Sequence, residues 1–228
     1  MSDGLAAILP DHPIYRVGRQ PDAWAWPDWM FVGPDGTFGN RWDDPAGIYR
    51  VLYACSQRVG AFVETLARYR PDLKVVAGLA EIDGPEDGLP PGVVPLSWLD
   101  TRACGDATCE GSFADIGEGR SLAILRMALA SRAVYYGFTD IDGAIIRSSA
   151  PRGFTQEISR FVYESNDAGR RFTGIRYLSR LGNEFVNWAI FEPPPYVASP
   201  IQSVSSSPIQ MGDADLAEAV RILGINFG

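Results

Sequence analysis

Apolar positions along the chain alternate between short, nearly continuous runs and longer stretches with helical spacing. Short apolar runs bounded by turn residues are typical of buried strands. On this basis we predict strands over residues 14–17, 47–55, 73–82, 93–98, 144–146, 172–179 and 187–191. Apolar residues at helical spacing predict helices over residues 57–70, 118–133, 155–164 and 213–223. Strands mixed with isolated helices predict an α+β fold, with a compact mixed sheet and flanking helices.

Local signals mark the ends of the predicted helices. Ser56 precedes the first helix and Thr155 opens the third, and both are residue types that cap helix N-termini. The first helix should end before Pro71, because the residue before a proline disfavours the helical conformation.

The distribution of Gly, Pro and Ser suggests how the chain is organised. Residues 83–117 are rich in Gly, Pro, Asp and Thr, which predicts an irregular insertion with one short strand. Residues 199–208 are rich in Ser and Pro and are typical of a linker. We therefore expect a single domain over residues 1–198, followed by a linker and a short terminal helix over 199–228 that packs on the domain.

Composition narrows the function. The chain has 228 residues, 46% hydrophobic and 21% charged, as expected of a globular protein with a sizeable core. Its net charge of −8 argues against direct nucleic-acid binding, which needs a basic surface. Long apolar runs and a basic leader are not seen, so we expect no membrane association. With three cysteines, an odd number, a reducing and therefore cytoplasmic location is expected.

Metal-based and histidine-based mechanisms fit the sequence poorly. His12 is the only histidine, so Cys104 and Cys109 lack the further ligands of a zinc site. A single histidine in a loop-like Asp-His-Pro also disfavours a Ser-His-Asp or Cys-His mechanism. We therefore expect no metal.

A few polar residues lie within apolar, ordered-looking segments. They are Arg16, Arg41, Tyr53, Glu64 and Ser179. A carboxylate such as Glu64 is costly on a partly buried helix face unless it is paired or functional. The simpler interpretation is a surface glutamate paired with Arg68 at the i+4 position, with ordinary surface arginines and a serine that ends its strand.

The order of these residues resembles that of the RES domain family. The similar segments are Tyr15-Arg16, Asn40-Arg41-Trp42-Asp43, Val51-Leu52-Tyr53-Ala54, Ala61-Phe62-Val63-Glu64, residues 174–180 with Ser179, and residues 187–191. Together they span most of the chain, from about residue 13 to 192.

This resemblance implies a fold related to the ADP-ribosyltransferase toxins, with NAD+ bound in a central cleft. It implies a toxin of a toxin–antitoxin pair that cleaves the nicotinamide–ribose bond of NAD+ by hydrolysis or phosphorolysis. Inorganic phosphate is then a possible co-substrate, and a helix-turn-helix antitoxin the expected partner. Alternatives are an ADP-ribosyltransferase that modifies a host protein, and a catalytically silent interaction module.

The resemblance also implies roles for the candidate residues. Glu64 would stabilise the oxocarbenium-like sugar that forms when nicotinamide leaves. Arg41 and Arg16 would grip the pyrophosphate or an incoming phosphate through paired hydrogen bonds. Tyr53 would stack on nicotinamide or ribose, and Ser179 would hold a ribose or phosphate oxygen.

Overall fold

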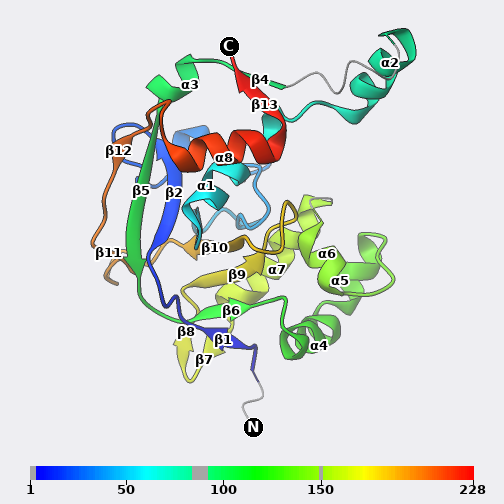
Figure 1. Ribbon diagram of the computed structural model, residues 1–228. Helices are drawn as coiled ribbons and strands as arrows, with labels where there is room; N and C mark the ends of the chain where they lie inside the picture. The colour runs from blue at the N-terminus through cyan, green and yellow to red at the C-terminus, as the bar shows by residue number, and fades with distance from the viewer. Residues whose placement is uncertain (1–3, 84–91, 149–150) are drawn as a thin grey trace.

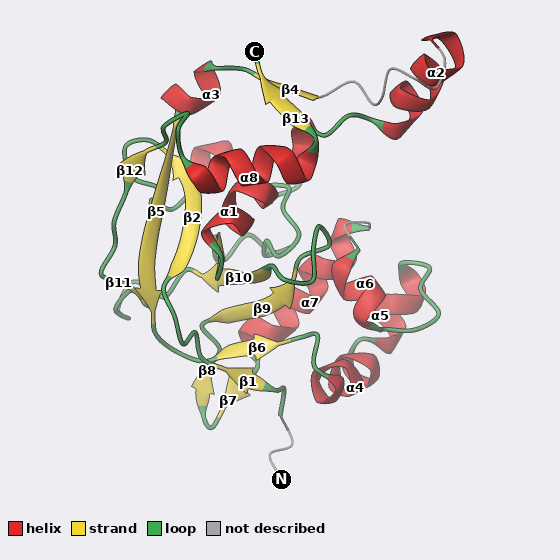
Figure 2. Ribbon diagram, viewed as in Figure 1, coloured by secondary structure: helices red, strands yellow, loops and turns green. Residues whose placement is uncertain are grey.

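A computed structural model describes residues 4–83, 92–148 and 151–228, and its mixed sheet with flanking helices confirms the expected α+β class (Figures 1 and 2). The strands are β1 (Ala7–Ile8), β2 (Ile14–Arg19), β3 (Val51–Cys55), β4 (Gly92–Val94), β5 (Arg102–Cys109), β6 (Phe113–Asp115), β7 (Asn166–Asp167), β8 (Arg170–Arg171), β9 (Gly174–Leu178), β10 (Val186–Phe191), β11 (Ile201–Gln202), β12 (Ser207–Pro208) and β13 (Ile225–Phe227). The helices are α1 (Arg58–Leu66), α2 (Leu73–Asp83), α3 (Ser97–Asp100), α4 (Gly119–Ala128), α5 (Ala130–Tyr135), α6 (Gly143–Arg147), α7 (Arg152–Glu164) and α8 (Ala214–Leu223), with 3-10 turns η1 (Trp29–Phe31) and η2 (Ala67–Tyr69).

The main sheet runs in the order β1-β6-β9-β10-β3-β2-β5-β11, and β12 also pairs with β5. Its pairs are antiparallel except for β6 and β9, which are parallel. The central pair is β3 with β10, whose register places Asn187 opposite Cys55. This pair brings the end of β3, the start of β10 and the helix that follows β3 to one place.

Helices cover the sheet in two groups (Figure 2). Helix α1 buries Ala61, Phe62, Val63 and Leu66 in a core that it shares with α8. Helices α4 to α7 enclose a second core on the β9 side of the sheet, which includes the fully buried Trp42. The site described below lies where the two groups meet.

Two predicted strands are helices in the structure. Residues 73–82 belong to α2, and residues 144–146 belong to α6. Each helix follows an aspartate whose carboxylate accepts a backbone N–H of the first turn: Asp72 from Lys74 at 2.7 Å, and Asp142 from Ala144 and Ile145 at 2.9 Å. Since a short apolar run fits a buried strand and a helix equally well, these caps decide the outcome.

The segment expected to be irregular contains two strands of the main sheet. From Arg102 onward the expectation is wrong, because β5 pairs along the length of β2 and β6 joins β1 to β9. Glycine is required at position 105, since an added Cβ would lie 2.3 Å from the Ser205 carbonyl oxygen. The stretch expected to be a linker likewise supplies β11 and β12. The rest of the expected insertion, residues 84–91, lies outside the described residues.

The expected helix caps also differ from the observed ones. Gln57, not Ser56, is the N-cap residue of α1, while the Ser56 hydroxyl accepts a hydrogen bond from the indole of Trp188 at 2.8 Å. Helix α7 begins three residues earlier than expected, so Thr155 lies within its first turn. The expected helix over 118–133 is divided at Leu129 into α4 and α5.

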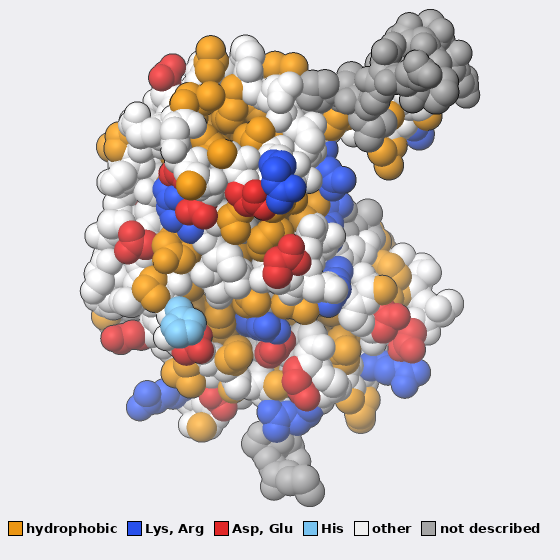
Figure 3. Space-filling model, in the orientation of Figure 1, with side chains coloured by type: hydrophobic (Ala, Val, Ile, Leu, Met, Phe, Trp, Pro, Cys, Tyr) orange, Lys and Arg blue, Asp and Glu red, His pale blue; other side chains and the backbone are white. Residues whose placement is uncertain are grey.

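The strand expected over residues 93–98 is correct only in its first part, β4, because Ser97 and Trp98 belong to helix α3. The remaining strand and helix predictions correspond to β2, β3, β9, β10, α1, α7 and α8, with shifts at their ends. Acidic and basic side chains are interspersed over the face seen in Figure 3. Within the described part of the chain, no helix has both the length and the apolar character needed to span a bilayer.

An ion-pair network joins α1 to α8. The Arg58 guanidinium contacts the carboxylates of Asp213 and Asp215, and Asp213 also accepts N–H groups from Asp215 and Leu216 as the N-cap of α8. Asp213→Ala should therefore lower the free energy of unfolding by about 1–2 kcal/mol, and Asp213→Asn by less, because Asn still caps the helix. Urea denaturation checks this, and equal losses for Ala and Asn would contradict the capping role.

The ion pair of Arg58 and Asp213 also makes the stability of the protein depend on pH. The hydrogen bond from Arg58 holds the pKa of Asp213 below its usual range. A depressed carboxyl pKa adds stability that is fully present above the unfolded-state pKa, about 4, and is lost as the pH falls through the folded-state value. The stability difference between wild type and Asp213→Asn should therefore shrink below about pH 4.

Candidate functional site

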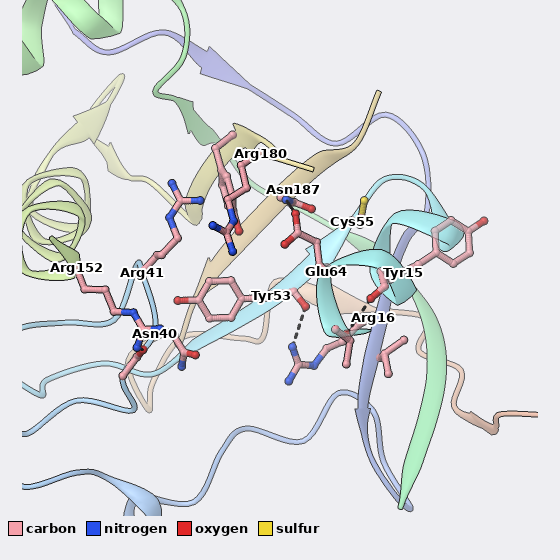
Figure 4. Close-up of a pocket in the computed structure, with 16 residues that line it drawn as sticks. Tyr15, Arg16, Asn40, Arg41, Tyr53, Cys55, Glu64, Arg152, Arg180 and Asn187 are labelled. Carbon is pink, nitrogen blue, oxygen red and sulfur yellow. Dashed lines mark hydrogen bonds between the residues drawn. The ribbon is translucent and has the colours of Figure 1, made fainter. Parts of the chain in front are cut away.

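A cavity of about 290 Å³ opens where α1, β2, β3 and the β9–β10 turn meet (Figure 4). Residues from the loop before β3 and from the start of α7 complete its wall. The polar side chains that line it are Tyr15, Arg16, Asn40, Arg41, Tyr53, Cys55, Glu64, Thr65, Arg152, Tyr177, Arg180 and Asn187. The cavity thus gathers four of the five candidate residues.

Glu64 is an exposed residue on the otherwise buried face of α1, between Val63 and Leu66. Its Oε1 accepts a hydrogen bond of 2.6 Å from Nδ2 of Asn187, a side chain only 2% exposed on β10. The simpler pairing of Glu64 with Arg68 is not formed, since Arg68 donates to the Tyr69 hydroxyl at 2.9 Å. The carboxylate is therefore held toward the cavity by the sheet beneath it (Figure 4).

Arg41 projects into the cavity from the loop before β3. Its guanidinium donates to the carbonyl oxygen of Ile146 near the end of α6, and lies 4.9 Å from the Trp42 ring and 5.3 Å from the Tyr177 ring. Burial lowers the pKa of Arg41, while Tyr177 and Glu64 raise it. An arginine pKa begins so high that the group stays charged at neutral pH.

Tyr53 presents its ring to the cavity, but its hydroxyl is engaged in the protein. The hydroxyl accepts the backbone N–H of Trp42 at 3.0 Å and donates to Asp43 at 3.4 Å. Burial, and next the nearby carboxylate of Asp43, raise the pKa of Tyr53 well above its usual value. The phenol therefore stays protonated, and its available contribution to a ligand is its ring.

The loop that carries Arg41 is fixed from two sides. Asp43, 3% exposed, accepts the backbone N–H of Asn40 at 2.6 Å, and burial raises the pKa of its carboxyl group. From α7, the Arg152 guanidinium donates to the Gly39 carbonyl and the Gln156 amide to the Asn40 carbonyl. These bonds preorganise the cationic wall of the cavity.

Arg16 is bound largely to the protein backbone. Its Nε donates to the Ala23 carbonyl at 2.7 Å. Its Nη1 donates to the Tyr53 carbonyl at 2.8 Å (Figure 4). Burial lowers the pKa of Arg16 to about 10, so its positive charge persists at neutral pH. Arg16 thus fixes β3 and contributes a positive charge to the cavity floor.

Ser179 is the candidate that the structure does not bring to the cavity wall. Its side chain is 1% exposed, and its hydroxyl accepts the backbone N–H of Leu181 at 2.9 Å. This bond shapes the turn after β9, where the neighbouring Arg180 reaches the cavity.

Sequence analysis missed Arg152, Arg180, Tyr177 and Asn187 as site residues. For Asn187 a signal was available, because a polar amide within a fully apolar strand needs a buried partner. The two arginines carry no such signal, since surface arginines are common. Only the packing of α7 and the β9–β10 turn shows where they lie.

The cavity is poorly suited to catalysis by a cysteine nucleophile or by a metal ion. Burial raises the pKa of the Cys55 thiol to about 12, so it is protonated and a poor nucleophile at neutral pH. Among the residues that the structure describes, no three His, Cys, Asp or Glu side chains are grouped to hold a metal ion. The cavity therefore combines one oriented carboxylate with several guanidiniums, a set that suits an anionic ligand with a reacting centre that becomes positive.

The fold and this cavity define an α+β protein with an arginine-lined cavity and one oriented carboxylate. Comparison with protein families matches residues 13–211 to the RES domain. This match covers most of the 228 residues, so the chain belongs to the RES domain family, as the sequence motifs indicated. A search of curated proteins gave no match, and neither did a search of solved structures.

The engaged hydroxyl of Tyr53 leads to a test that needs no ligand. Tyr53→Phe leaves the ring in place but removes an acceptor from the Trp42 N–H and a donor from Asp43. We expect the free energy of unfolding to fall by about 1–2 kcal/mol, measured by urea denaturation. An unchanged stability would show that the hydroxyl does not hold the loop.

Proposed function

We propose that this RES domain protein cleaves the nicotinamide–ribose bond of NAD+ and acts as a toxin by consuming NAD+. The observation that carries the proposal is the Glu64 carboxylate, oriented by Asn187 and facing a cavity that is also lined by Arg41 and Arg180 (Figure 4). A dinucleotide with two phosphates and a cationic leaving group has the charges that this arrangement complements.

Glu64 supplies the main catalytic interaction. As the N-glycosidic bond breaks, positive charge develops on the ribose, and a carboxylate beside it stabilises that charge more strongly than the ground state. One carboxylate oxygen is engaged by Asn187, so the other is available to a ribose hydroxyl. Nicotinamide leaves as a neutral molecule, and this departure requires no protonated histidine.

The arginines of the cavity bind the phosphates of the substrate. Arg41, Arg152 and Arg180 line the side of the cavity where a pyrophosphate would bind, and guanidiniums form paired hydrogen bonds with phosphate oxygens. Arg16 supports this binding through its charge and through its hold on the Tyr53 carbonyl. The Tyr53 ring supplies an apolar surface for nicotinamide or ribose.

The acceptor of the ADP-ribosyl group is identified by its product. Water gives ADP-ribose, inorganic phosphate gives ADP-ribose 1″-phosphate, and a host protein gives a labelled protein.

The proposal includes a cytoplasmic location, where NAD+ is available and where the buried, unpaired cysteines would stay reduced. It also includes a helix-turn-helix antitoxin as the partner that silences the enzyme.

Substitution of Glu64 tests the proposal. Glu64→Gln keeps the size of the side chain and removes its charge, so we expect kcat for nicotinamide release to fall about a hundredfold or more. Purified protein is incubated with NAD+, with and without phosphate, and nicotinamide is quantified by chromatography. Labelled NAD+ in a cell lysate detects transfer to protein.

Glu110→Gln is the matched control, because Glu110 is exposed and follows β5, outside the cavity lining. It should retain wild-type activity. If wild type releases no nicotinamide under any condition and labels no protein, the catalytic proposal is wrong and a silent interaction module remains.

Asn187 provides a second test of the same geometry. Asn187→Ala leaves the Glu64 carboxylate charged but no longer oriented, so kcat should fall about tenfold or more while KM changes less. Steady-state kinetics separates the two constants. Glu64→Gln combined with Asn187→Ala should be no slower than Glu64→Gln alone, and additive losses would contradict a positioning role for Asn187.

A further inference from the structure

Three arginines gather at one end of the sheet, beyond the cavity. Arg19 ends β2, Arg102 begins β5 and Arg68 lies in η2, just after α1. Arg19 and Arg102 are register partners across the strand pair, so their side chains lie on the same face of the sheet. We call Arg19, Arg68 and Arg102 the basic triad.

The basic triad lacks the carboxylate partners that other arginines of this protein have. Arg50, Arg58, Arg126, Arg132, Arg160, Arg176 and Arg221 all form ion pairs with Asp or Glu. Within the described ranges, no carboxylate is ion-paired with any member of the triad.

Arg102 lies opposite Arg19 in the strand pair and within electrostatic range of both Arg19 and Arg68. Burial lowers the pKa of Arg102, and the positive charges of Arg19 and Arg68 lower it further. Like charges held together without counter-charges cost free energy in the unliganded protein. A bound anion would remove that cost.

Aromatic contacts leave guanidinium edges available to such an anion. Arg68 lies 4.8 Å from the Tyr69 ring, to whose hydroxyl it donates one hydrogen bond, and Arg19 lies 5.5 Å from the Phe31 ring. A guanidinium has five N–H donors, so a contact with a ring and one hydrogen bond leave other donors for a phosphate. Arg19 and Arg68 are also solvent-exposed, and Arg102 is half-buried.

The triad continues two walls of the cavity. Tyr15 and Val17 line the cavity, and Arg19 follows them on the same face of β2. Thr65 lines the cavity from α1, and Arg68 lies three residues farther along the same helical face. Arg102 also lowers the pKa of the cavity residue Arg16, so the two sites are electrostatically coupled.

We propose that Arg19, Arg68 and Arg102 form a phosphate-binding subsite beside the cavity. The ligand is a phosphoryl group, either on a free anion or as an additional phosphate on a dinucleotide held in the cavity. Binding at this subsite requires no bond cleavage, so it stands or fails separately from the proposed NAD+ reaction.

The first test measures the melting temperature of the protein at increasing concentrations of inorganic pyrophosphate. Chloride is used to keep the ionic strength constant. Pyrophosphate should raise the Tm of wild type and of Glu64→Gln, because a ligand that binds the folded state stabilises it. Arg68→Gln and Arg102→Gln should each weaken the apparent affinity about tenfold or more. Arg170→Gln removes the same charge from an exposed arginine on β8, outside the triad, and should respond like wild type.

Without the anion, the melting temperature of Arg102→Gln separates a structural role from a ligand-binding role. A structural role predicts a lower Tm than that of wild type. If the triad is a binding site, Arg102→Gln should melt at the same temperature as wild type or higher, because repulsion is relieved. Should Arg102→Gln fail to fold, the exposed Arg68→Gln still provides the test. A pyrophosphate response that is absent in wild type, or unchanged in both Arg68→Gln and Arg102→Gln, would overturn the proposal.

A second arm identifies the source of the phosphate. Dissociation constants for NAD+ and NADP+ are measured by calorimetry on Glu64→Gln, with and without Arg68→Gln. Tighter binding of NADP+ that is lost with Arg68→Gln shows that the subsite holds a phosphate of the dinucleotide. Equal constants, together with the pyrophosphate response, show that the subsite holds a free anion.

Discussion

The register of β10 against β3 decides where the Glu64 carboxylate can lie. This pairing places Asn187 opposite Cys55, directly beneath the helix that follows β3. A buried amide without a partner costs about 1–3 kcal/mol, and Glu64 supplies the acceptor. A one-residue slip of the strand pair would turn Asn187 to the other face and release the carboxylate. The orientation of the proposed catalytic group is therefore a property of the sheet.

The arginines of the cavity are also held in place by the surrounding backbone. Arg16 and Arg41 are buried enough for their pKa values to fall, yet both donate to backbone carbonyls. Carbonyl partners accept N–H groups of both arginines without neutralising the charge, whereas a carboxylate would cancel it; the buried Nε of Arg41 has no hydrogen-bond partner in the part of the protein that the structure describes. The Ile146 carbonyl lies near the end of α6, where the helix dipole is negative. Among the described residues, neither Arg16 nor Arg41 is ion-paired with a carboxylate, although the chain has a net charge of −8.

Local sequence predicted the parts of the fold with strong periodicity or clear chemistry. The helix of Glu64 and the strand of Tyr53 were predicted because apolar neighbours set their period. The helices α2 and α6 were not predicted, because a short apolar run fits a strand and a helix equally well when the Asp cap before it is left aside. Strand β5 was missed because Gly105 and Asp106 are typical of loops, although close packing requires the glycine.

The sequence predicted only those residues of the candidate site that lie within recognisable motifs. Arg16, Arg41, Tyr53 and Glu64 lie in segments whose sequence motifs are informative, and the structure brings them together. Arg152 and Arg180 reach the cavity from distant segments, and their proximity depends on tertiary packing that a single sequence does not reveal. Ser179 was expected at the ligand because of its motif, but its hydroxyl is used by the turn. The motifs therefore predicted which segments line the cavity better than they predicted which side chains reach it.

The most direct test of the account is a time course of proton NMR spectra of NAD+ with the purified wild-type protein. The account predicts that the nicotinamide ring signals of NAD+ convert into those of free nicotinamide, in step with loss of the signal from the attached ribose anomeric proton. Nicotinamide signals that stay unchanged, at protein concentrations where NAD+ binding is saturated, would contradict it.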